Sequence, residues 1–421
     1  MPRTTLITIF LAVGLFFICY SQVAHFRTAR NLCTVLEIIE EKGLYPLGQK
    51  YLFRTAVSAM AETHDIHSAY IPPFRSDRYL RMLDQQMTGI GISVTQDANG
   101  GGLVVANPII GQPHPAYDAG IRAGDEIVQV AGKPVADKSL AEVTKQIQGK
   151  AGTEVEIVVQ RGEATQRIPL RVKRAKITVD SVLGVHRTPD TSWNFSLPSD
   201  PDIAYFQITD FGDRTAEELR KALAQVTANK PPVGIIIDLR DNAGGYLSAA
   251  IDTADLFLHL GNIVTTRGRG GTIRETFDAH EGIAWPDIPL VVLVNGQSAS
   301  ASEIFAACMQ DHQRATIVGN RSFGKGSVQQ MIPLPDGGLL KLTTSTYHRP
   351  NGENINRQPS MDPDATWGVH PDDGWEVRVT EQQEKQRREQ RGMRVATPVS
   401  APAATEHPAA DPALEKAIEA L

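Results

Sequence analysis

The spacing of apolar residues divides the chain into three patterned stretches. From Asn31 to Thr88, apolar residues recur three and four positions apart, for example in 35–43 and 51–64, which predicts a small helical segment. Between Gly89 and Ile177, short runs alternate apolar and polar positions, which is typical of half-buried strands. After Asp202, continuous apolar runs alternate with helical patterns, which favours an α/β core.

The β-rich stretch contains one predicted helix. Ser139 and Glu142 have the S-x-x-E spacing of a capping box, in which each side chain accepts a hydrogen bond from the backbone of the other residue. The helical pattern ends near Gly149, and glycine is favoured just after a helix. We therefore expect a compact domain of short strands with a single flanking helix.

The α/β stretch combines buried strands, helices and a further β-rich part. Its predicted strands are 203–208, 233–240 and 289–294, and its predicted helices are 215–226 and 302–312. The second β-rich part follows in 327–335 and 337–348. After Thr380 a charged segment gives way to an Ala/Pro-rich stretch, and an amphipathic helix over 414–421 could dock back on the core.

The N-terminus carries an apolar run from Thr4 to Tyr20, directly after Arg3. Its length is close to the minimum for a membrane-spanning helix and long for the core of a signal peptide. Either interpretation implies export, and the lack of a convincing cleavage site favours an uncleaved anchor. Arg27 and Arg30 follow the run and leave its orientation undecided.

Five parts are therefore expected. They are a signal peptide or membrane anchor (1–28), a helical segment (29–88), a β-rich domain (89–177), an α/β core (178–380), and a C-terminal region of charged helix, flexible tail and short helix (381–421).

Composition narrows the class of protein. The chain has 421 residues, 41% hydrophobic and 21% charged, which is typical of a globular protein of two or three domains. Its net charge of −6 gives no basic excess for binding nucleic acid. The three cysteines exclude a disulfide framework and have no metal-binding spacing, and Cys308 falls in an apolar helical pattern that favours a small core residue.

Three serines occupy alternate positions where a predicted strand meets a predicted helix. Ser298, Ser300 and Ser302 follow the apolar run 289–294. The first N–H groups of a helix are unpaired, so a hydroxyl there could attack a carbonyl while backbone donors hold the oxyanion. On this stretch alone, however, the S-x-x-E spacing of Ser300 and Glu303 favours a capping box without a catalytic role.

A serine nucleophile needs a base, and no histidine pattern supplies one. The GxSxG signature is absent, and the later histidines His312, His348 and His370 stand in no recognisable motif. Lys325 lies between two glycines, and no acidic residue occurs between Arg321 and Pro335. A lysine acts as a base only when neutral, so its pKa must fall from about 10.4 to roughly 7–8, which burial can achieve. Considered alone, such a GKG is more often a turn.

Residues 89–177 resemble a PDZ domain. The resemblance is carried by Gly89, Ile90, Gly91 and Ile92, by the block AGIRAGDEIVQVAGKPV at 119–135, and by the single flanking helix. In that family the loop equivalent to GIGI presents N–H groups to a peptide's terminal carboxylate, and the peptide adds as a strand to the sheet edge. The alternative is that the glycines only permit a tight turn.

The chain from Asn31 to Val377 resembles the carboxyl-terminal processing proteases, serine peptidases with a Ser-Lys catalytic pair. The motifs that carry this resemblance stand in the family's order: DIHSAYIPP (65–73), GIGI (89–92), DLRDNAGG (238–245), SASASEI (298–304), FGKGSVQ (323–329) and GVHPD (368–372). Together they are far more specific than any single one. The resemblance implies an α/β protease core of mixed strands and helices, an inserted β-rich PDZ-like domain and an N-terminal helical segment.

The resemblance also implies roles for individual residues. Ser300 corresponds to the nucleophile, and Lys325, 25 positions later, to the base. Gln329 corresponds to the residue that orients the lysine amine. Ala301 and either Gly245 or Gly244 correspond to the backbone donors of the oxyanion hole, and Gly245 is the preferred choice. Asp311 matches a family position whose role the sequence leaves open.

The expected function is that of an exported serine endopeptidase of the cell envelope or periplasm. It hydrolyses peptide bonds through an acyl-enzyme, selects protein substrates by their C-terminal tails through the PDZ-like domain, and uses no metal or nucleotide cofactor. A membrane partner follows if the N-terminal run is retained, and oligomerisation is left open. The alternatives are a non-catalytic PDZ-type adaptor on a protease scaffold, and an esterase or amidase acting on small molecules.

Overall fold

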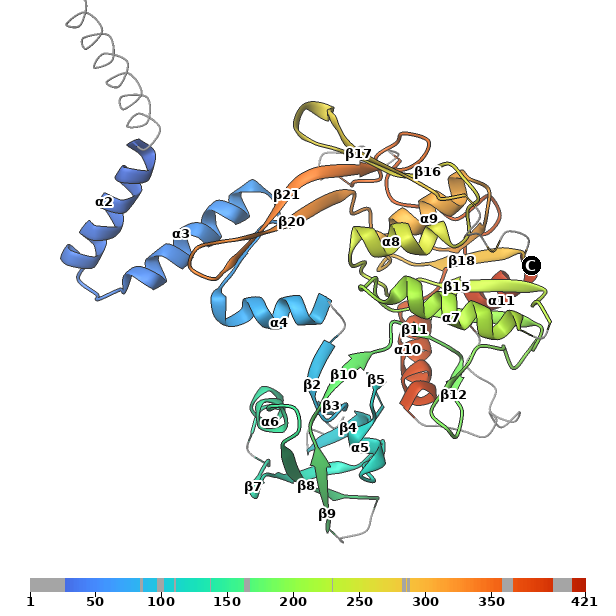
Figure 1. The fold of residues 1–421 in the computed structure, drawn as a ribbon, viewed down its shortest axis with the longest axis horizontal. Coiled ribbons are helices and arrows are strands. Elements are labelled where there is room, and N and C mark those ends of the chain that lie inside the picture. The colour runs from blue at the N-terminus through green and yellow to red at the C-terminus, as the bar shows by residue number, and fades with distance from the viewer. Residues whose placement is uncertain are drawn as a thin grey trace, which may run out of the picture. The chain divides into compact units, whose positions relative to one another are not determined.

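The computed structural model describes residues 27–83, 86–96, 102–109, 111–136, 138–162, 167–228, 230–281, 285, 288–357, 366–396 and 411–421 (Figure 1). They form two compact units. The first unit comprises the described parts of Met1–Ser76 together with Gln329–Thr343, and the second those of Asp77–Val328 and Thr344–Leu421. The apolar run from Thr4 to Tyr20 lies outside the described residues. Within the residues described, no helix has the length and apolar character needed to cross a bilayer.

The first unit contains the N-terminal helices and a short sheet. Helices α2 (Arg27–Lys42) and α3 (Gln49–His64) contain the two predicted helical patterns. Strand β1 (Ala69–Ile71) pairs antiparallel with the start of β21 (Leu339–His348), and β21 also pairs with β20 (Ser327–Pro333). Helix α4 (Pro73–Leu83) follows β1.

The β-rich domain lies in the second unit and has one main sheet. Its strands run in the order β3 (Ser93–Gln96), β4 (Leu103–Asn107), β6 (Glu126–Val130), β8 (Glu154–Gln160) and β9 (Arg167–Lys173), with β7 (Lys133–Pro134) against β6. Helices α5 (Pro115–Asp118) and α6 (Leu140–Ile147) flank it, and a smaller sheet joins β2 (Gln86–Gly89), β10 (Ala175–Val179) and β5 (Gly111–Gln112). The predicted capping box of Ser139 and Glu142 is formed at the start of α6.

The α/β core is built on a five-stranded sheet. Its order is β11 (Val182–Leu183), β14 (Ile203–Ile208), β15 (Gly234–Asp238), β18 (Leu290–Val294) and β19 (Thr316–Gly319), with parallel pairing from β14 to β19. Helices α7 (Thr215–Thr227), α8 (Leu247–Asp255) and α9 (Ala301–Asp311) contribute to the apolar cluster on one face. Helix α11 (Pro412–Glu419) covers the other face, where Ala413 and Ala417 pack against the strands.

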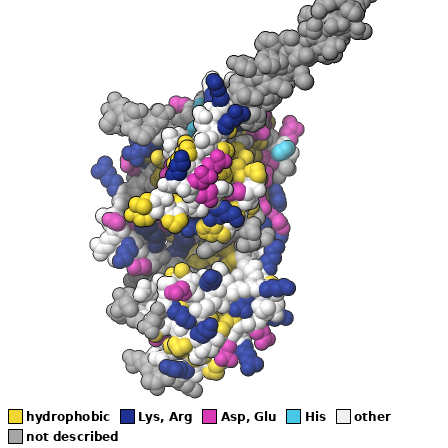
Figure 2. Space-filling view, turned by 90° about the vertical axis from the view of Figure 1, so that its left-hand side faces the viewer, with side chains coloured by type: hydrophobic (Ala, Val, Ile, Leu, Met, Phe, Trp, Pro, Cys, Tyr) yellow, Lys and Arg dark blue, Asp and Glu magenta, His cyan; other side chains and the backbone are white. Residues whose placement is uncertain are grey.

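Smaller elements complete the second unit. Strands β12 (His186–Arg187) and β13 (Trp193–Asn194) form a hairpin, and so do β16 (Asn262–Arg267) and β17 (Ile273–Asp278), which are separated by a 3-10 turn at Arg269–Gly271. The charged segment forms helix α10 (Glu381–Ala396). Basic and acidic side chains are both spread over the face drawn in Figure 2.

The parallel pairing explains where the site forms. Strand β15 pairs with β18 from Ile235 opposite Leu290, so their carboxyl ends lie at the same edge of the sheet. The loops that follow, 239–246 and 295–300, must therefore meet, as is usual for ligand sites in open α/β sheets. Their contact is direct, because the Ala299 N–H donates to the Asn242 carbonyl at 2.9 Å.

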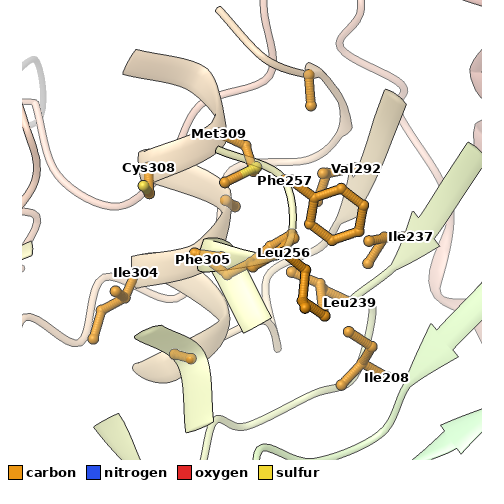
Figure 3. Packing of buried hydrophobic residues seen from close by; sticks show 14 of the residues in the cluster. Ile208, Ile237, Leu239, Leu256, Phe257, Val292, Ile304, Phe305, Cys308 and Met309 are labelled. Atoms are coloured by element: carbon orange, nitrogen blue, oxygen red, sulfur yellow. The ribbon is translucent and has the colours of Figure 1, made fainter. Parts of the chain in front are cut away.

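The core beneath these loops is tightly packed around α9 (Figure 3). Phe305 is fully buried, and its ring lies 6.0 Å from that of Phe257 and 6.3 Å from that of Phe211, measured between centroids. Cys308 is also fully buried, which agrees with its predicted role as a small core residue, and burial raises the pKa of its thiol. The α/β core, the inserted β-rich domain and the N-terminal helices together confirm the predicted fold class.

Replacing Phe305 measures how much the packing around α9 contributes to the stability of the fold. We expect Phe305→Ala to lower the free energy of unfolding by about 3–5 kcal/mol, because the side chain leaves a cavity among packed neighbours. Chemical denaturation followed by circular dichroism measures this. Leu260→Ala is the control, since Leu260 is 66% exposed and its removal should change stability by less than about 0.5 kcal/mol. A loss below about 1 kcal/mol for Phe305→Ala would contradict the packing described.

Candidate active site

The three serines between β18 and α9 have different environments. Ser298 is fully buried, and its hydroxyl donates to the Leu239 carbonyl at 2.8 Å. Ser302 is also fully buried, and its hydroxyl donates to the Asn242 carbonyl at 2.9 Å. Ser300 is half-buried and occupies the N-cap of α9. Two of the serines therefore hold the loops together, and Ser300 is the one of the three that is not fully buried.

Ser300 has an unusual backbone conformation. Its φ is 58° and its ψ is −114°, a region that a residue with a Cβ rarely adopts. Such a conformation costs about 1–3 kcal/mol and persists only where surrounding contacts enforce it. The contacts that hold Ser300 are therefore part of the site.

Glu303 provides the first of these contacts. Its side chain is fully buried, and Oε2 accepts the backbone N–H of Ser300 at 2.8 Å and that of Lys325 at 2.8 Å. Oε1 accepts the Gly324 N–H at 2.6 Å and the Ser322 hydroxyl. Burial raises the pKa of Glu303, and these four donors oppose the shift because they stabilise the carboxylate. One carboxylate thus joins the serine to the lysine loop.

Tyr347 makes a second connection between the same two residues. Its hydroxyl lies near two carbonyls, that of Ser300 at 3.1 Å and that of Lys325, and its single proton is shared between them. The side chain is 2% exposed, and burial, together with the nearby charge of Glu303, raises the pKa of its hydroxyl well above the usual value. It therefore remains a donor at physiological pH, and the N–H and C=O groups of Ser300 and Lys325 share partners on both sides.

The glycines around Lys325 permit this close packing. A Cβ on Gly324 would lie 2.7 Å from the Trp367 ring, and one on Gly326 would lie 2.6 Å from the Asn356 nitrogen. Lys325 itself is half-buried. The two glycines are therefore required by the close packing of this loop.

Gln329 and Asp311 occupy different surroundings. Gln329 lies on β20, and its side-chain amide donates to the Thr343 hydroxyl at 3.2 Å. Asp311 ends α9 and forms an ion pair with Arg349, and it also accepts the Asn351 N–H at 3.1 Å. Asp311 therefore anchors the turn at 349–351, ten residues along the helix from Ala301.

The glycine loop of DLRDNAGG lies beside Ser300. Gly244 has a φ of 108°, and a Cβ there would lie 2.8 Å from the Ser300 Cβ and 3.1 Å from the Ala301 nitrogen. The Gly244 N–H already donates to Asn242 Oδ1 at 2.9 Å. Its own N–H is thus paired, and Gly244 keeps space open next to Ser300 and the Ala301 N–H, while Gly245 stays the predicted oxyanion donor.

The GIGI loop connects β2 to β3 in the β-rich domain. Ile90 is 1% exposed and belongs to that domain's core, while Gly91 has a φ of 77°. Strand β3 lies at the edge of its sheet, and helix α6 contacts it. An edge strand beside a helix, preceded by a glycine loop, is the arrangement that accepts a peptide as an added strand.

Comparison with known proteins gives consistent matches. The model of Peptidase family S41 matches residues 202–372, and that of the PDZ domain matches residues 112–161. A carboxy-terminal-processing protease of Bartonella bacilliformis is 36% identical over 307 residues, covering 72% of this chain and 67% of the relative. A chloroplastic C-terminal processing peptidase of Tetradesmus obliquus is 30% identical over 332 residues, covering 74% of this chain and 70% of the relative.

The chain belongs to the carboxy-terminal processing protease family. The Peptidase family S41 model falls on the α/β core, and the PDZ model falls on the β-rich domain. The chain is therefore a serine-type peptidase with a PDZ domain, and its substrates are proteins. A solved structure of the photosystem II D1 C-terminal processing protease is 30% identical to this chain, with a TM-score of 0.45, and covers 81% of this chain and 85% of the other.

The sequence did not reveal two residues of this candidate site, and it revealed the role of a third only in part. Tyr347 lies 47 residues after Ser300 within an ordinary strand pattern, and no local signal marks it. Asn242 stood inside the DLRDNAGG motif, where an asparagine before two glycines could have suggested a loop-stabilising side chain. Glu303 was identified only as a capping residue.

Filling the space at Gly244 should block the site of this protease. Gly244→Ala places a methyl group against Ser300 and the Ala301 N–H, so we expect kcat/KM for a peptide substrate to fall by at least about 100-fold. Gly352→Ala is the matched control, because Gly352 also has a positive φ, 90°, but no atom lies within 4 Å of a Cβ there. Equal activity of the two variants would show that the space beside Ser300 is not used.

Proposed function

We propose that the protein is an exported endopeptidase in which Lys325 activates Ser300 for attack on a peptide carbonyl. The observation that carries this proposal is the pair of shared partners, since Glu303 accepts both backbone N–H groups and the Tyr347 hydroxyl shares its proton between both carbonyls. These bonds fix the backbones of nucleophile and base relative to each other. Such positioning contributes to catalysis because it removes the entropy of bringing the groups together.

Lys325 acts as the base only in its uncharged form. It accepts the Ser300 hydroxyl proton as Oγ bonds to the substrate carbonyl carbon, and the carbonyl oxygen becomes an oxyanion. When the C–N bond breaks, the lysine returns that proton to the leaving amine and an acyl-enzyme remains. A water molecule then loses a proton to Lys325 and attacks the ester carbon, and as the ester C–O bond breaks the lysine returns that proton to Ser300 Oγ, which regenerates the free serine and the neutral lysine. The predicted role of Gln329 is to orient the lysine amine.

The oxyanion is stabilised by the N–H groups of Ala301 and Gly245. Ala301 is the first residue of α9, so its N–H belongs to the first turn that has no intrahelical acceptor. The fixed position of Gly244 beside Ser300 supports the placement of Gly245 as the second donor. Donors held in place before the reaction begins stabilise the developing charge more than mobile water does.

The PDZ domain selects substrates by their free C-terminal tails. The tail would add as a strand to β3, and its carboxylate would meet backbone N–H groups of the loop formed by Gly89, Ile90, Gly91 and Ile92. The apolar run at Thr4–Tyr20 supports export to the cell envelope or periplasm, either as a cleaved signal or as a retained anchor.

A non-catalytic tail-binding adaptor is the alternative. Such a protein would have no need for two separate bridges between a serine and a lysine on distant segments, and here both bridges are formed. An esterase acting on small molecules would have no use for a PDZ domain. Both alternatives are distinguished from the proposal by cleavage of a folded reporter with an apolar tail.

Substitutions at the serines and the lysine test the chemistry directly. On such a reporter, Ser300→Ala and Lys325→Ala should abolish cleavage, and Lys325→Arg should do the same because a guanidinium keeps its proton. Ser298→Ala is the control, since it removes a structural hydroxyl and should leave kcat within about threefold while lowering stability by about 1 kcal/mol. Full cleavage by Lys325→Arg would refute the assignment of the base.

Tail capture is tested by changing the GIGI loop. We expect Gly91→Val to raise KM for a reporter with a free apolar tail and to leave a short internal peptide unaffected, because a side chain is strained at a φ of 77° and its Cβ would lie 3.0 Å from Ile177, so the loop must shift. Cleavage rates for free and amidated tails provide the measurement. If the wild-type protein cleaves both tails equally, the carboxylate is not recognised.

A further inference from the structure

The C-terminal arm, defined as α10 together with residues 411–421, reaches the loops of the active site. Helix α11 packs its apolar side on the sheet, with Ala413 and Ala417 at 1% and 0% exposure. Helix α10 contacts β12 of the core and β4 of the PDZ domain. The arm lies beyond the part of the chain matched by the peptidase family model, which ends at residue 372.

Asp411 at the start of α11 binds a buried arginine. Arg240 is 3% exposed, and its guanidinium donates to both carboxylate oxygens of Asp411, at 2.7 and 2.9 Å. It also forms a salt bridge of 2.6 Å with Asp238, whose carboxylate accepts the Tyr205 hydroxyl. A buried guanidinium requires such partners, because removing one leaves part of its charge uncompensated.

Arg387 on α10 binds the next residue along the same loop. Its guanidinium forms an ion pair with Asp241 and another of 2.7 Å with Glu384. Asp241 has a φ of 63°, and its backbone N–H donates to Asn295 Oδ1 at 3.0 Å. Two helices that are far from this loop in sequence therefore hold two consecutive residues of it, Arg240 and Asp241. Asp241 is the one in the strained conformation.

The loop continues directly into the catalytic region. Asn242 Oδ1 accepts the Gly244 N–H at 2.9 Å, and its backbone carbonyl accepts the Ala299 N–H and the Ser302 hydroxyl. These bonds place Gly244 against Ser300. Displacement of residues 240 and 241 would thus be transmitted through residues 242 and 243 to the glycines beside Ser300.

We propose that Arg387 and Asp411 are positioning residues for peptide hydrolysis, because they hold the loop Asp238–Gly245 in the conformation that presents its glycine N–H to the reacting carbonyl. This inference rests on the proposed function. Since α10 also contacts β4, the arm connects the oxyanion loop physically to the domain that captures the substrate tail.

The test uses the full chain and a peptide reporter. We expect Arg387→Gln and Asp411→Asn to lower kcat by at least about tenfold with KM within about twofold, since an oxyanion donor acts mainly in the transition state. The midpoint of the pH dependence of kcat/KM should not move, because Lys325 is untouched. Arg387→Lys should recover part of the lost kcat by keeping the charge.

Matched controls lie on the same two helices. Lys385→Gln and Glu415→Gln make the same kinds of change at exposed positions, Lys385 being 75% exposed, and should behave as wild type. Near-ultraviolet circular dichroism at the assay temperature measures the folded fraction. Arg387 keeps the test available if Asp411→Asn does not fold, because it lies on a separate helix.

Three results would overturn the inference, two of them in the rates and one in the pH dependence. One is an unchanged kcat in folded Arg387→Gln, and the other is a loss of activity that equals the loss of folded protein in every variant. Neither result would affect the proposed function, which fails instead if Ser300→Ala still cleaves the reporter. A shift in the pH midpoint would also count against the inference, since it would mean that the lysine loop rather than the oxyanion loop had moved.

Discussion

The site depends on one buried carboxylate. Glu303 has no exposed surface, and its two oxygens accept hydrogen bonds from Ser300, Ser322, Gly324 and Lys325. A buried charge is tolerated only when it is well satisfied, so moving the lysine loop away would leave the charge without most of its donors. Separating the lysine loop from the serine therefore costs much free energy. The two are about twenty residues apart in sequence and make no regular secondary structure with each other.

This coupling removes an apparent choice between two interpretations of the same motif. The S-x-x-E spacing of Ser300 and Glu303 indicated a helix cap with no catalytic role, and the family resemblance indicated a nucleophile. In the structure, Glu303 caps the Ser300 N–H and at the same time binds the backbone of the lysine loop. The capping residue thus also connects the two positions proposed as nucleophile and base, and the two interpretations are compatible.

Much of the fold followed from the sequence because its signals are local. The capping box of Ser139, the apolar run of β15 and the period of α9 depend on neighbouring residues, and all three elements formed as expected. The contribution of Tyr347 to the site did not follow, because its hydroxyl meets Ser300 only after a strand from a different part of the chain has been placed. The pairing of Asp411 with Arg240 likewise joins residues 171 positions apart, and no periodic pattern in the sequence indicates it.

The burial of α9 limits how such an enzyme can be controlled. Nine residues of this helix are buried, from Ala301 to Met309, and its N-cap is Ser300, the proposed nucleophile. Because these residues are packed in the hydrophobic core, the helix cannot withdraw Ser300 without opening that core. Regulation must instead act on the two loops that approach Ser300 from outside the helix. These are the lysine loop and the glycine loop. The enzyme can thus be inactive, with one of these loops displaced, while Ser300 stays in place.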